Sequence, residues 1–325
     1  MKANIQEVDT LVQDYFISNW YSEDTALWMT DNLIEAELFW KATHGLVRVP
    51  WILSNKIPDS HLSNEDIQLQ PNAVNLIDST NQNGYLSCDH VVDEMIKLLD
   101  KDDCKFVVSV LKSAFPSSIL LRYLKRFYEH RLMALVLGTT PRLVSDADQV
   151  PNIFWTNPIG YTLPLQDNRA LLADFSTSDI PLWKVLMVHQ GDKKVLQKWR
   201  LLDRDWKITD STHNAFWKDG KFLWSLLPFW WEDGIHKWMM ISLFIEIISA
   251  YLSWNRSDKG DLVLVWAKAD LVAGWQEWIA KLLTWATDRW GLKRLPWEVS
   301  MQNYYRNRES WLITVPDNVA KLIWL

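Results

Sequence analysis

The sequence predicts an α+β protein that is predominantly helical, with a helical N-terminal part followed by a mixed helix and β-hairpin C-terminal part. Three observations support this prediction. The first 100 residues hold 16 acidic and 5 basic residues, whereas residues 183–325 hold 16 acidic and 20 basic ones. Those last 143 residues also contain 17 of the 22 tryptophans. Between them, VPNIFWTNPIGYTLPLQDN has three prolines and no helical period.

These changes in composition predict three segments. Residues 1–150 form a helical acidic domain, residues 151–182 an irregular Pro-containing connector, and residues 183–325 a Trp-rich mixed α/β domain.

The N-terminal segment shows three helical signals. Ser22 can cap a helix with Glu23 and Asp24 in its first turn, and Gly45 follows its last turn. Two further apolar faces read as helices: Val92, Met95, Ile96 and Leu99, then Phe106, Val107, Val110, Leu111 and Ala114. Pro116 ends the second of these, and Ser117 or Ser118 caps a helix running through Leu124 and Phe127. Residues 54–87 are polar and turn-rich, so we predict mostly loop there.

The C-terminal segment predicts two hairpins, two helices and two strands. WKVLMVHQ and KKVLQKWRLL flank a Gly-Asp turn, and NAFWK and KFLWSLL flank an Asp-Gly turn. Helices follow at 235–254 and at 271–290, the second capped by Asp270 and ended by Gly291. DLVLVWA at 261–267 reads as a short buried strand, and SWLITVP near the C-terminus as an edge strand.

Charge, cysteine content and hydropathy exclude several classes of protein. A net charge of −6 disfavours a surface that binds nucleic acid or anionic lipid throughout. Two cysteines and the absence of an N-terminal signal sequence favour the cytoplasm. The apolar segment 238–254 is short for a membrane span, and Ser242, Glu246, Ser249 and Ser253 form a polar stripe along it. We therefore predict no membrane span but a core helix whose polar edge faces water or a partner.

The tryptophans and one basic helix face are the candidate binding residues. Trp230 and Trp231 are adjacent in a predicted loop between Pro228 and Asp233, so both cannot enter one core. Tryptophan is enriched at interface hot spots, which predicts a protein contact at this loop. Arg122, Lys125 and Arg126 share a helix face that can hold phosphate, an acidic partner or the chain's own acidic N-terminal residues. The simpler interpretation of this face is a solvated surface paired with Glu129.

Four weaker patterns in the sequence suggest binding or chemistry. Asp174 or Asp179 with Asp192 and Lys194 has the composition of a metal-dependent nuclease site, although Asp192 lies in a predicted turn. A carbohydrate-binding module would use exposed tryptophan rings. Two further groups have spacings that favour structural roles over a metal or acid–base site: Cys88, His90, Cys104 and His130, and Asp203, Asp205, Asp210 and His213.

The candidate residues form no recognised catalytic motif. The sequence therefore favours a non-catalytic interaction subunit or adaptor of an intracellular assembly, and a bacterial source is favoured. Its partners are other protein subunits, with nucleic acid not favoured. No cofactor and no metal site are predicted, since the sequence has no Gly-rich phosphate loop and only 10 glycines. A metal-dependent nuclease or hydrolase is the first alternative function, and a Trp-based carbohydrate-binding module is the second.

Overall fold

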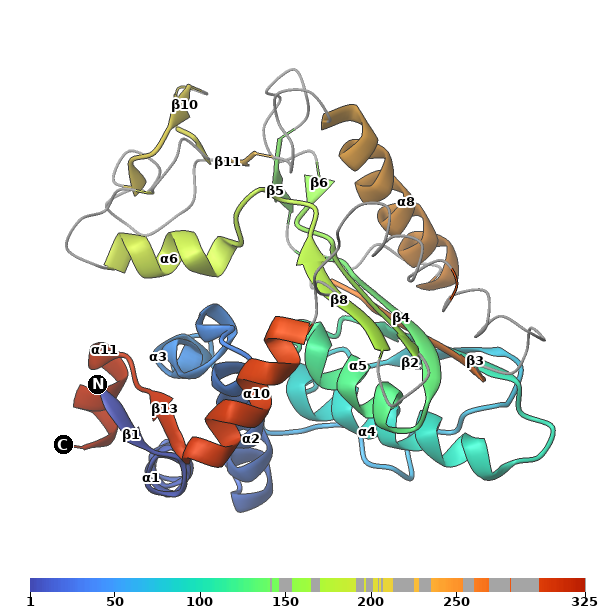
Figure 1. The fold of residues 1–325 in the computed structure, drawn as a ribbon, viewed down its shortest axis with the longest axis horizontal. Coiled ribbons are helices and arrows are strands. Elements are labelled where there is room, and N and C mark those ends of the chain that lie inside the picture. Colours follow the sequence, from blue (N-terminus) through green and yellow to red (C-terminus); the bar gives the residue numbers. More distant parts are fainter. Residues whose placement is uncertain are drawn as a thin grey trace.

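A six-stranded mixed sheet forms the centre of the protein (Figure 1). The computed structural model describes residues 1–140, 142–145, 154–164, 170–190, 196, 201–203, 205, 207–212, 225–227, 235–253, 260–268, 281 and 298–324. The strand order is β2 (Val74–Asp78), β3 (Phe106–Lys112), β12 (Leu262–Lys268), β4 (Leu132–Gly138), β7 (Pro158–Pro164) and β8 (Ala170–Ser176). Only β2 and β3 are parallel, and the other neighbours are antiparallel.

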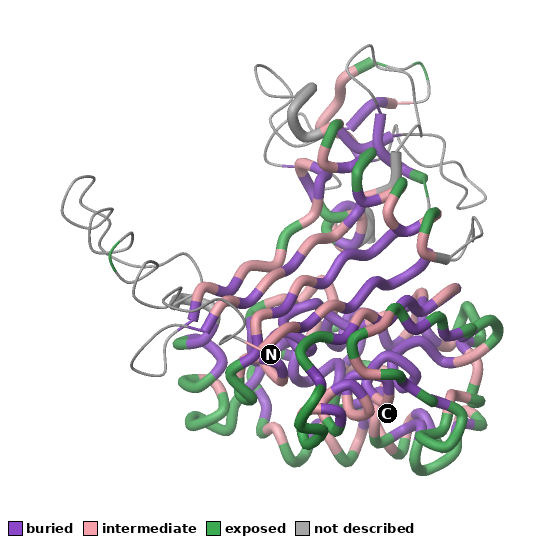
Figure 2. The backbone as a smooth tube through the Cα atoms, turned by 90° about the vertical axis from the view of Figure 1, so that its right-hand side faces the viewer, coloured by how far each residue is buried: buried purple, intermediate pink, exposed green. Residues whose placement is uncertain are grey.

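Strand β12 ties the C-terminal half of the chain into a sheet built mainly by the N-terminal half. It lies between β3 and β4, with Leu264 paired to Ser109 on one side and to Val136 on the other. Figure 2 shows buried and half-buried backbone along these strands and exposed backbone around the helical end of the molecule. The continuous apolar run LVLVWA suits such a central strand, which is covered on both faces.

Helices cover both faces of this sheet. Helices α4 (Gly84–Lys97) and α5 (Leu120–Glu129) pack on one face, and α8 (Ile235–Ser253) packs on the other (Figure 1). On the first face, the buried Trp266 ring of β12 reaches α4, where its Nε1–H donates to the Met95 carbonyl at 3.0 Å. A buried indole with its N–H satisfied stabilises the core without an unpaired donor.

The two ends of the chain form a helical layer beside the sheet. Its N-terminal elements are β1 (Lys2–Asn4), α1 (Ile5–Ser18), α2 (Glu23–Leu38), the short 3-10 helices η1 (Ala42–His44) and η2 (Leu46–Arg48), and α3 (Val49–Ser54). A third 3-10 helix, η3 (Leu98–Asp100), follows α4. The C-terminal elements are α10 (Glu298–Ser310), β13 (Leu312–Thr314) and α11 (Asp317–Ile323). Strands β1 and β13 pair antiparallel, so both ends of the chain belong to one unit (Figure 1).

A second, smaller sheet lies at the other end of the main sheet. Its order is β10 (Ile208–Thr209), β9 (Leu201–Leu202), β11 (Ser225–Leu226), β5 (Arg142–Val144) and β6 (Phe154–Trp155). Helix α6 (Leu182–Gln190) connects this sheet to the helical layer, because it contacts η1.

The prediction of a predominantly helical fold is wrong. Residues 106–112 form β3 instead of a helix, β2 lies in the predicted loop 54–87, and β7 and β8 lie in the predicted irregular connector. The run FVVSVLK is apolar on both faces, a pattern that fits a buried strand as well as a buried helix. The first predicted hairpin is also wrong at its start, since LWKVLMVHQ forms α6.

Other local predictions are confirmed. Ser22 caps α2 by accepting from the Thr25 backbone N–H at 3.3 Å, although the helix ends at Leu38 rather than beside Gly45. The helices at 92–97, 120–129 and 235–253 and the strands at 262–267 and 312–314 are present. The cap of α5 is not Ser117 or Ser118, because its N-cap is Ile119. The predicted helix 271–290 and the second predicted hairpin lie almost entirely outside the described residues.

At Ser242 and Ser249 the polar stripe of α8 faces the protein interior, so the predicted orientation toward water or a partner is wrong there. Ser242 and Ser249 are buried, and Asn157 Nδ2 donates to Ser242 Oγ at 2.6 Å and to Glu246 Oε1 at 3.0 Å. The opposite face of the helix exposes apolar side chains, including Phe244 and Ile247. Within the part of the chain that the structure describes, no helix has the length and apolar character to cross a membrane.

Candidate active site

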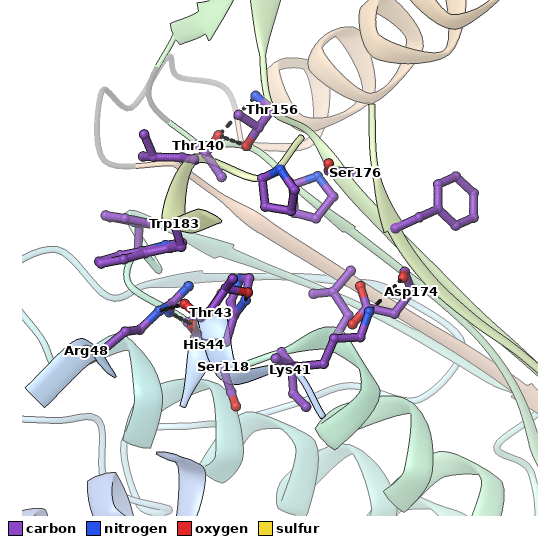
Figure 3. A pocket seen from close by; sticks show the side chains of 18 of the residues that line it. Lys41, Thr43, His44, Arg48, Ser118, Thr140, Thr156, Asp174, Ser176 and Trp183 are labelled. Atoms are coloured by element: carbon purple, nitrogen blue, oxygen red, sulfur yellow. Dashed lines mark hydrogen bonds between the residues drawn. The ribbon is translucent and has the colours of Figure 1, made fainter. Parts of the chain in front are cut away.

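A pocket opens between the helical layer, the end of the main sheet and α6 (Figure 3). It holds about 940 Å³ of space not filled by protein atoms, part of it open to solvent. Polar and charged side chains from five separate parts of the chain line it: Lys41, Thr43, His44, Arg48, Ser117, Ser118, Thr140, Thr156, Asp174 and Ser176. Trp183 and Phe115 add aromatic surface.

His44 projects into the pocket from η1, which is part of a tight turn between α2 and α3. Its backbone N–H donates to the Lys41 carbonyl at 2.7 Å, and its Nδ1 is 3.0 Å from Thr43 Oγ1. That contact leaves Nε2 as the ring nitrogen available to a ligand. Burial lowers the pKa of His44 well below its usual range, and the nearby positive charges of Arg48 and Lys41 lower it further. The imidazole is therefore neutral at pH 7.

Arg48 supplies a buried cation beside this imidazole. Its Nε donates to the Thr43 carbonyl at 3.3 Å and one terminal nitrogen donates to Tyr85 Oη at 3.1 Å, which fixes the plane of the guanidinium. The Trp183 ring lies 4.2 Å from the guanidinium carbon, close enough for a cation–π contact. Burial lowers the pKa of Arg48, but a guanidinium stays charged at neutral pH.

Lys41 and Asp174 form the other side of the pocket. Figure 3 shows Arg48 and Lys41 on opposite sides of Thr43 and His44. Lys41 Nζ donates to the Asp174 backbone carbonyl at 3.4 Å. Burial raises the pKa of Asp174, while the charge of Lys41 and a hydrogen bond from the Leu121 N–H oppose the rise. Leu121 is in the first turn of α5, so the Asp174 carboxylate also supplies a cap that the sequence next to the helix does not provide.

A row of hydroxyl groups lines the pocket opposite His44. Thr140 follows β4, Thr156 lies between β6 and β7, and Ser176 ends β8. The Thr140 and Thr156 hydroxyls are 2.6 Å apart, and the Thr156 N–H donates to Thr140 Oγ1 at 3.1 Å. These neutral groups can donate to or accept from a polar ligand without adding charge.

The arrangement can bind an anion and exchange a proton with it. Two cations and a single carboxylate with a raised pKa line the pocket among the described residues, so a carboxylate is favoured over a cation. A neutral imidazole in the same space can accept a proton from a bound hydroxyl group.

The basic face predicted from the sequence lies outside this pocket and is largely buried. Arg122 pairs with Asp89, Glu35 and Asp31, and Lys125 pairs with Glu35 and Glu129. Arg126 pairs with Asp89 and Asp93. Burial alone would lower the pKa of Arg122, but the surrounding carboxylates raise it well above its ordinary value. The chain's own acidic N-terminal residues therefore neutralise this face.

We expect Asp89→Asn to lower the free energy of unfolding by about 3–5 kcal/mol, because it leaves buried guanidinium groups without their main counter-charge. Asp89 is fully buried and accepts from Arg122 Nε at 2.9 Å. Urea denaturation at pH 7 measures the loss. The matched control is Asp31→Asn, whose side chain is 59% exposed and which should lose under about 1 kcal/mol. Equal losses in the two variants would show that burial of this cluster does not govern its contribution.

The tryptophans divide between core, pocket and surface. Trp230 and Trp231 lie outside the described residues, so their predicted protein contact stays a prediction. Trp266 and Trp183 are buried, whereas the most exposed of the described tryptophans are Trp20, Trp40, Trp311 and Trp324.

Within the described residues, the weaker sequence patterns do not come together as sites. Asp174 belongs to the pocket, but Asp192 and Lys194 of the nuclease pattern lie outside the described residues. Across residues 1–140, which include Cys88, His90, Cys104 and His130, no group of three or more such side chains could hold a metal ion. Asp203 accepts from the Asp205 and Lys207 backbone N–H groups at 2.9 Å, as expected for a turn, and His213 is outside the described residues.

Sequence reasoning missed every residue that carries the chemistry of the pocket except Asp174. The available signal was the segment KATHGLVR, which places a lysine, a histidine and an arginine around one glycine between two apolar helices. As a helix-ending signal Gly45 is misleading, because it lies six residues beyond the helix C-cap Phe39.

Comparison with known proteins gives a consistent result. A family model described as malate/L-lactate dehydrogenase matches residues 3–264. The (2R)-3-sulfolactate dehydrogenase (NADP(+)) of Chromohalobacter salexigens is 20% identical over 255 residues, which is 77% of this chain and 72% of that protein.

Solved structures with the same fold include a dehydrogenase from Sinorhizobium meliloti, with a TM-score of 0.79 and 16% identity over 100% of this chain and 97% of that one. Malate dehydrogenase from Entamoeba histolytica has a TM-score of 0.77 and 17% identity, over 100% of this chain and 97% of that chain. At these identities the structural similarity establishes the fold.

Proposed function

The chain belongs to the malate/L-lactate dehydrogenase family, and we propose that its His44 pocket interconverts a 2-hydroxy acid and the corresponding 2-oxo acid. Membership of a dehydrogenase family overturns the prediction of a non-catalytic adaptor or complex subunit, and gives no support to the nuclease or carbohydrate-binding alternatives. The prediction failed because it took the absence of a Gly-rich nucleotide-binding motif as evidence against an enzyme.

One observation supports the proposal above all: a neutral imidazole and a buried guanidinium share one pocket. A 2-hydroxy acid carries a carboxylate one carbon away from the hydroxyl that is oxidised. A site for it therefore needs a cation and a base close together, and Arg48 and His44 provide that pair.

In this proposal Arg48 binds the substrate carboxylate. The guanidinium is held by Thr43 and Tyr85 before substrate arrives, so little side-chain freedom is lost on binding. Lys41, on the other side of His44, adds positive potential and favours acids that carry a second anionic group.

His44 handles the proton. In the oxidation direction, the hydroxyl proton moves to the imidazole, the C2–H bond breaks with loss of a hydride, and the C2–O bond becomes a carbonyl. In the reduction direction, the imidazolium returns the proton to the oxygen as hydride arrives at C2. A substrate carboxylate bound near Arg48 partly cancels the positive charge that lowers the pKa of His44, so the imidazole becomes a stronger base once substrate is present.

The pocket lining fits the reactive end of a nicotinamide cofactor. Such a cofactor supplies the hydride acceptor or donor when it is bound. Its flat ring and carboxamide match an aromatic side chain, Trp183, next to hydroxyl donors and acceptors at Thr140, Thr156 and Ser176. We propose that these four residues hold the nicotinamide end.

A substrate panel tests the proposal. The wild-type protein is incubated with NAD⁺ or NADP⁺ and lactate, malate or 3-sulfolactate, and reduced cofactor is followed by absorbance. We expect turnover of at least one acid and none of the corresponding 2-hydroxy amide, which lacks the carboxylate. Turnover of simple alcohols and not of acids would contradict the assignment of Arg48.

We expect kcat/KM for oxidation to stay level as pH falls through about 6.5, the ordinary pKa of histidine. The base must be unprotonated, and its pKa in the free protein is lowered, so the acid limb lies well below that pH. Reduction needs the protonated imidazole, so its kcat/KM should keep rising as pH falls over the same range. Steady-state rates between pH 5 and 9 measure both.

Lys41→Met is the matched variant for this pH dependence. Removing one of the charges that lower the pKa of His44 should shift the acid limb of oxidation toward higher pH. An acid limb at or above pH 6.5 in the wild type would contradict the proposed base.

We also propose a cytoplasmic location, because both cysteines are buried and unpaired, as expected in a reducing compartment. A contact with other protein subunits through Trp230 and Trp231 stays a prediction.

A further inference from the structure

A buried glutamate on α2 contacts the turn that carries the candidate active-site residues. Glu37 is 6% exposed, and its Oε1 accepts a hydrogen bond from the Leu46 backbone N–H at 2.9 Å. Leu46 is fully buried and begins η2, so its N–H needs this acceptor in the absence of water.

Gly45 is matched to the same carboxyl group. A Cβ placed at Gly45 would lie 2.2 Å from Glu37 Oε1 and 2.6 Å from its Cδ, distances that no side chain can occupy. Gly45 has φ −91°, outside the left-handed region that favours glycine, so the constraint considered at this position is the space beside the Glu37 carboxyl group. The Glu37 carboxyl therefore packs directly against the backbone of the turn.

This turn holds both residues that the proposed reaction needs. His44 immediately precedes Gly45, and the Arg48 backbone N–H donates to the Gly45 carbonyl at 3.0 Å. A displacement of Gly45 and Leu46 moves the base and the anion-binding group together.

Burying the Glu37 carboxyl group costs free energy of desolvation, which points to a role beyond filling space. No lysine, arginine or histidine among the described residues forms an ion pair with it. An apolar side chain of similar size would avoid the desolvation of a carboxyl group but would leave the Leu46 N–H unpaired.

We propose that Glu37 is a positioning residue: its carboxyl group clamps the Gly45–Leu46 turn and so fixes His44 and Arg48 relative to the substrate. The inference rests on the proposed function. Neither Glu37 nor Gly45 lines the pocket, so both act through the turn.

Four variants test it: Glu37→Ala, Glu37→Gln, Gly45→Ala and the double variant Glu37→Ala/Gly45→Ala. We expect Glu37→Ala to lower kcat/KM for the 2-hydroxy acid by about 10²-fold, the loss typical of a misplaced reactive group. Glu37→Gln keeps an oxygen acceptor for Leu46 and should stay within about 3-fold of wild type. Glutamine restores both the volume of glutamate and an oxygen acceptor, so this rescue shows that the acceptor needs no charge, and the double variant separates the Gly45 contact from volume.

The double variant isolates the contact. Gly45→Ala alone should lower kcat/KM by about 10²-fold, because its Cβ collides with the carboxyl group. On the Glu37→Ala background the same change should cost less than about 3-fold, since the colliding atoms are gone. If the fold losses in kcat/KM of the two single variants simply multiply in the double variant, the proposal is overturned.

Glu35→Gln is the matched control. It is a second buried carboxyl on α2, but it faces Arg122 and Lys125 instead of the turn. It should lower the urea midpoint and leave kcat/KM within about 2-fold of wild type. Wild-type kcat/KM in Glu37→Ala would overturn the positioning role.

Absence of turnover in the wild type would count against the proposed function instead. The urea midpoints of the two single alanine variants and of the double variant then test the Glu37–Gly45 contact on their own, because additive shifts would show that the two residues do not interact.

Discussion

His44→Gln is expected to lower kcat by about 10²–10⁴-fold in both directions, the usual contribution of a general acid–base. Glutamine keeps a polar group of similar reach but cannot carry the proton. KM for the acid should change much less, because Arg48 still binds the carboxylate. Steady-state kinetics at pH 7 separate the two parameters.

His90→Gln is the control for this variant. His90 lies on α4, where its Nδ1 contacts the Leu62 carbonyl at 2.6 Å, and it does not line the pocket. It should retain the kinetics of the wild type. Equal loss in the two histidine variants, or no loss in His44→Gln, would remove His44 from the proposed mechanism.

Arg48→Met should lower kcat/KM for the 2-hydroxy acid by about 10²–10³-fold, the effect of deleting one partner of a buried charge pair. The loss should appear mainly as a higher KM. Removing the positive charge also removes one cause of the low pKa of His44, so the acid limb of oxidation should move to higher pH.

Arg48→Lys distinguishes charge from geometry. Lysine restores the charge but cannot reproduce the fork that donates to Thr43 and Tyr85 and stacks on Trp183. We expect the pH profile to return toward that of the wild type while most of the loss in kcat/KM remains. A methionine variant that still prefers acids to their amides would contradict the role of Arg48.

Much of the local structure was predictable from the sequence because short-range signals control it. Ser22 caps α2, the apolar period marks α8, and the run LVLVWA forms a buried strand. The main error concerned β3. Its run FVVSVLK is apolar on both faces, and only the pairing of Val110 with Leu76 and Val263 makes it a strand.

The candidate site was not predictable because tertiary structure assembles it. Segments near residues 44, 118, 156, 174 and 183 meet at the pocket, and no sequence spacing relates them. Lys41 and Arg48 lie close to His44 along the chain, but their spacing alone indicates no particular chemistry. Its importance becomes visible only when α6 brings Trp183 over Arg48 and both line the same pocket as the imidazole.

Arg122 shows the opposite case. The basic face on α5 was visible in the sequence, and so was the excess of acidic residues in the first 100. The structure pairs the two internally, through Asp89, Glu35 and Asp31. The charge pattern of the sequence indicated that the basic face of α5 could pair with acidic N-terminal residues. Only the packed structure shows that these ion pairs are buried.

The most direct test of the central claim follows the hydrogen atom itself. Wild-type protein is supplied with oxidised nicotinamide cofactor and a 2-hydroxy acid deuterated at C2, and the reduced cofactor is analysed by mass spectrometry. The proposed function predicts one deuterium in the reduced nicotinamide ring with the wild type, and none above background with His44→Gln over the same time. Turnover of the acid without deuterium in the cofactor, or no turnover of any 2-hydroxy acid by the wild type, would contradict it.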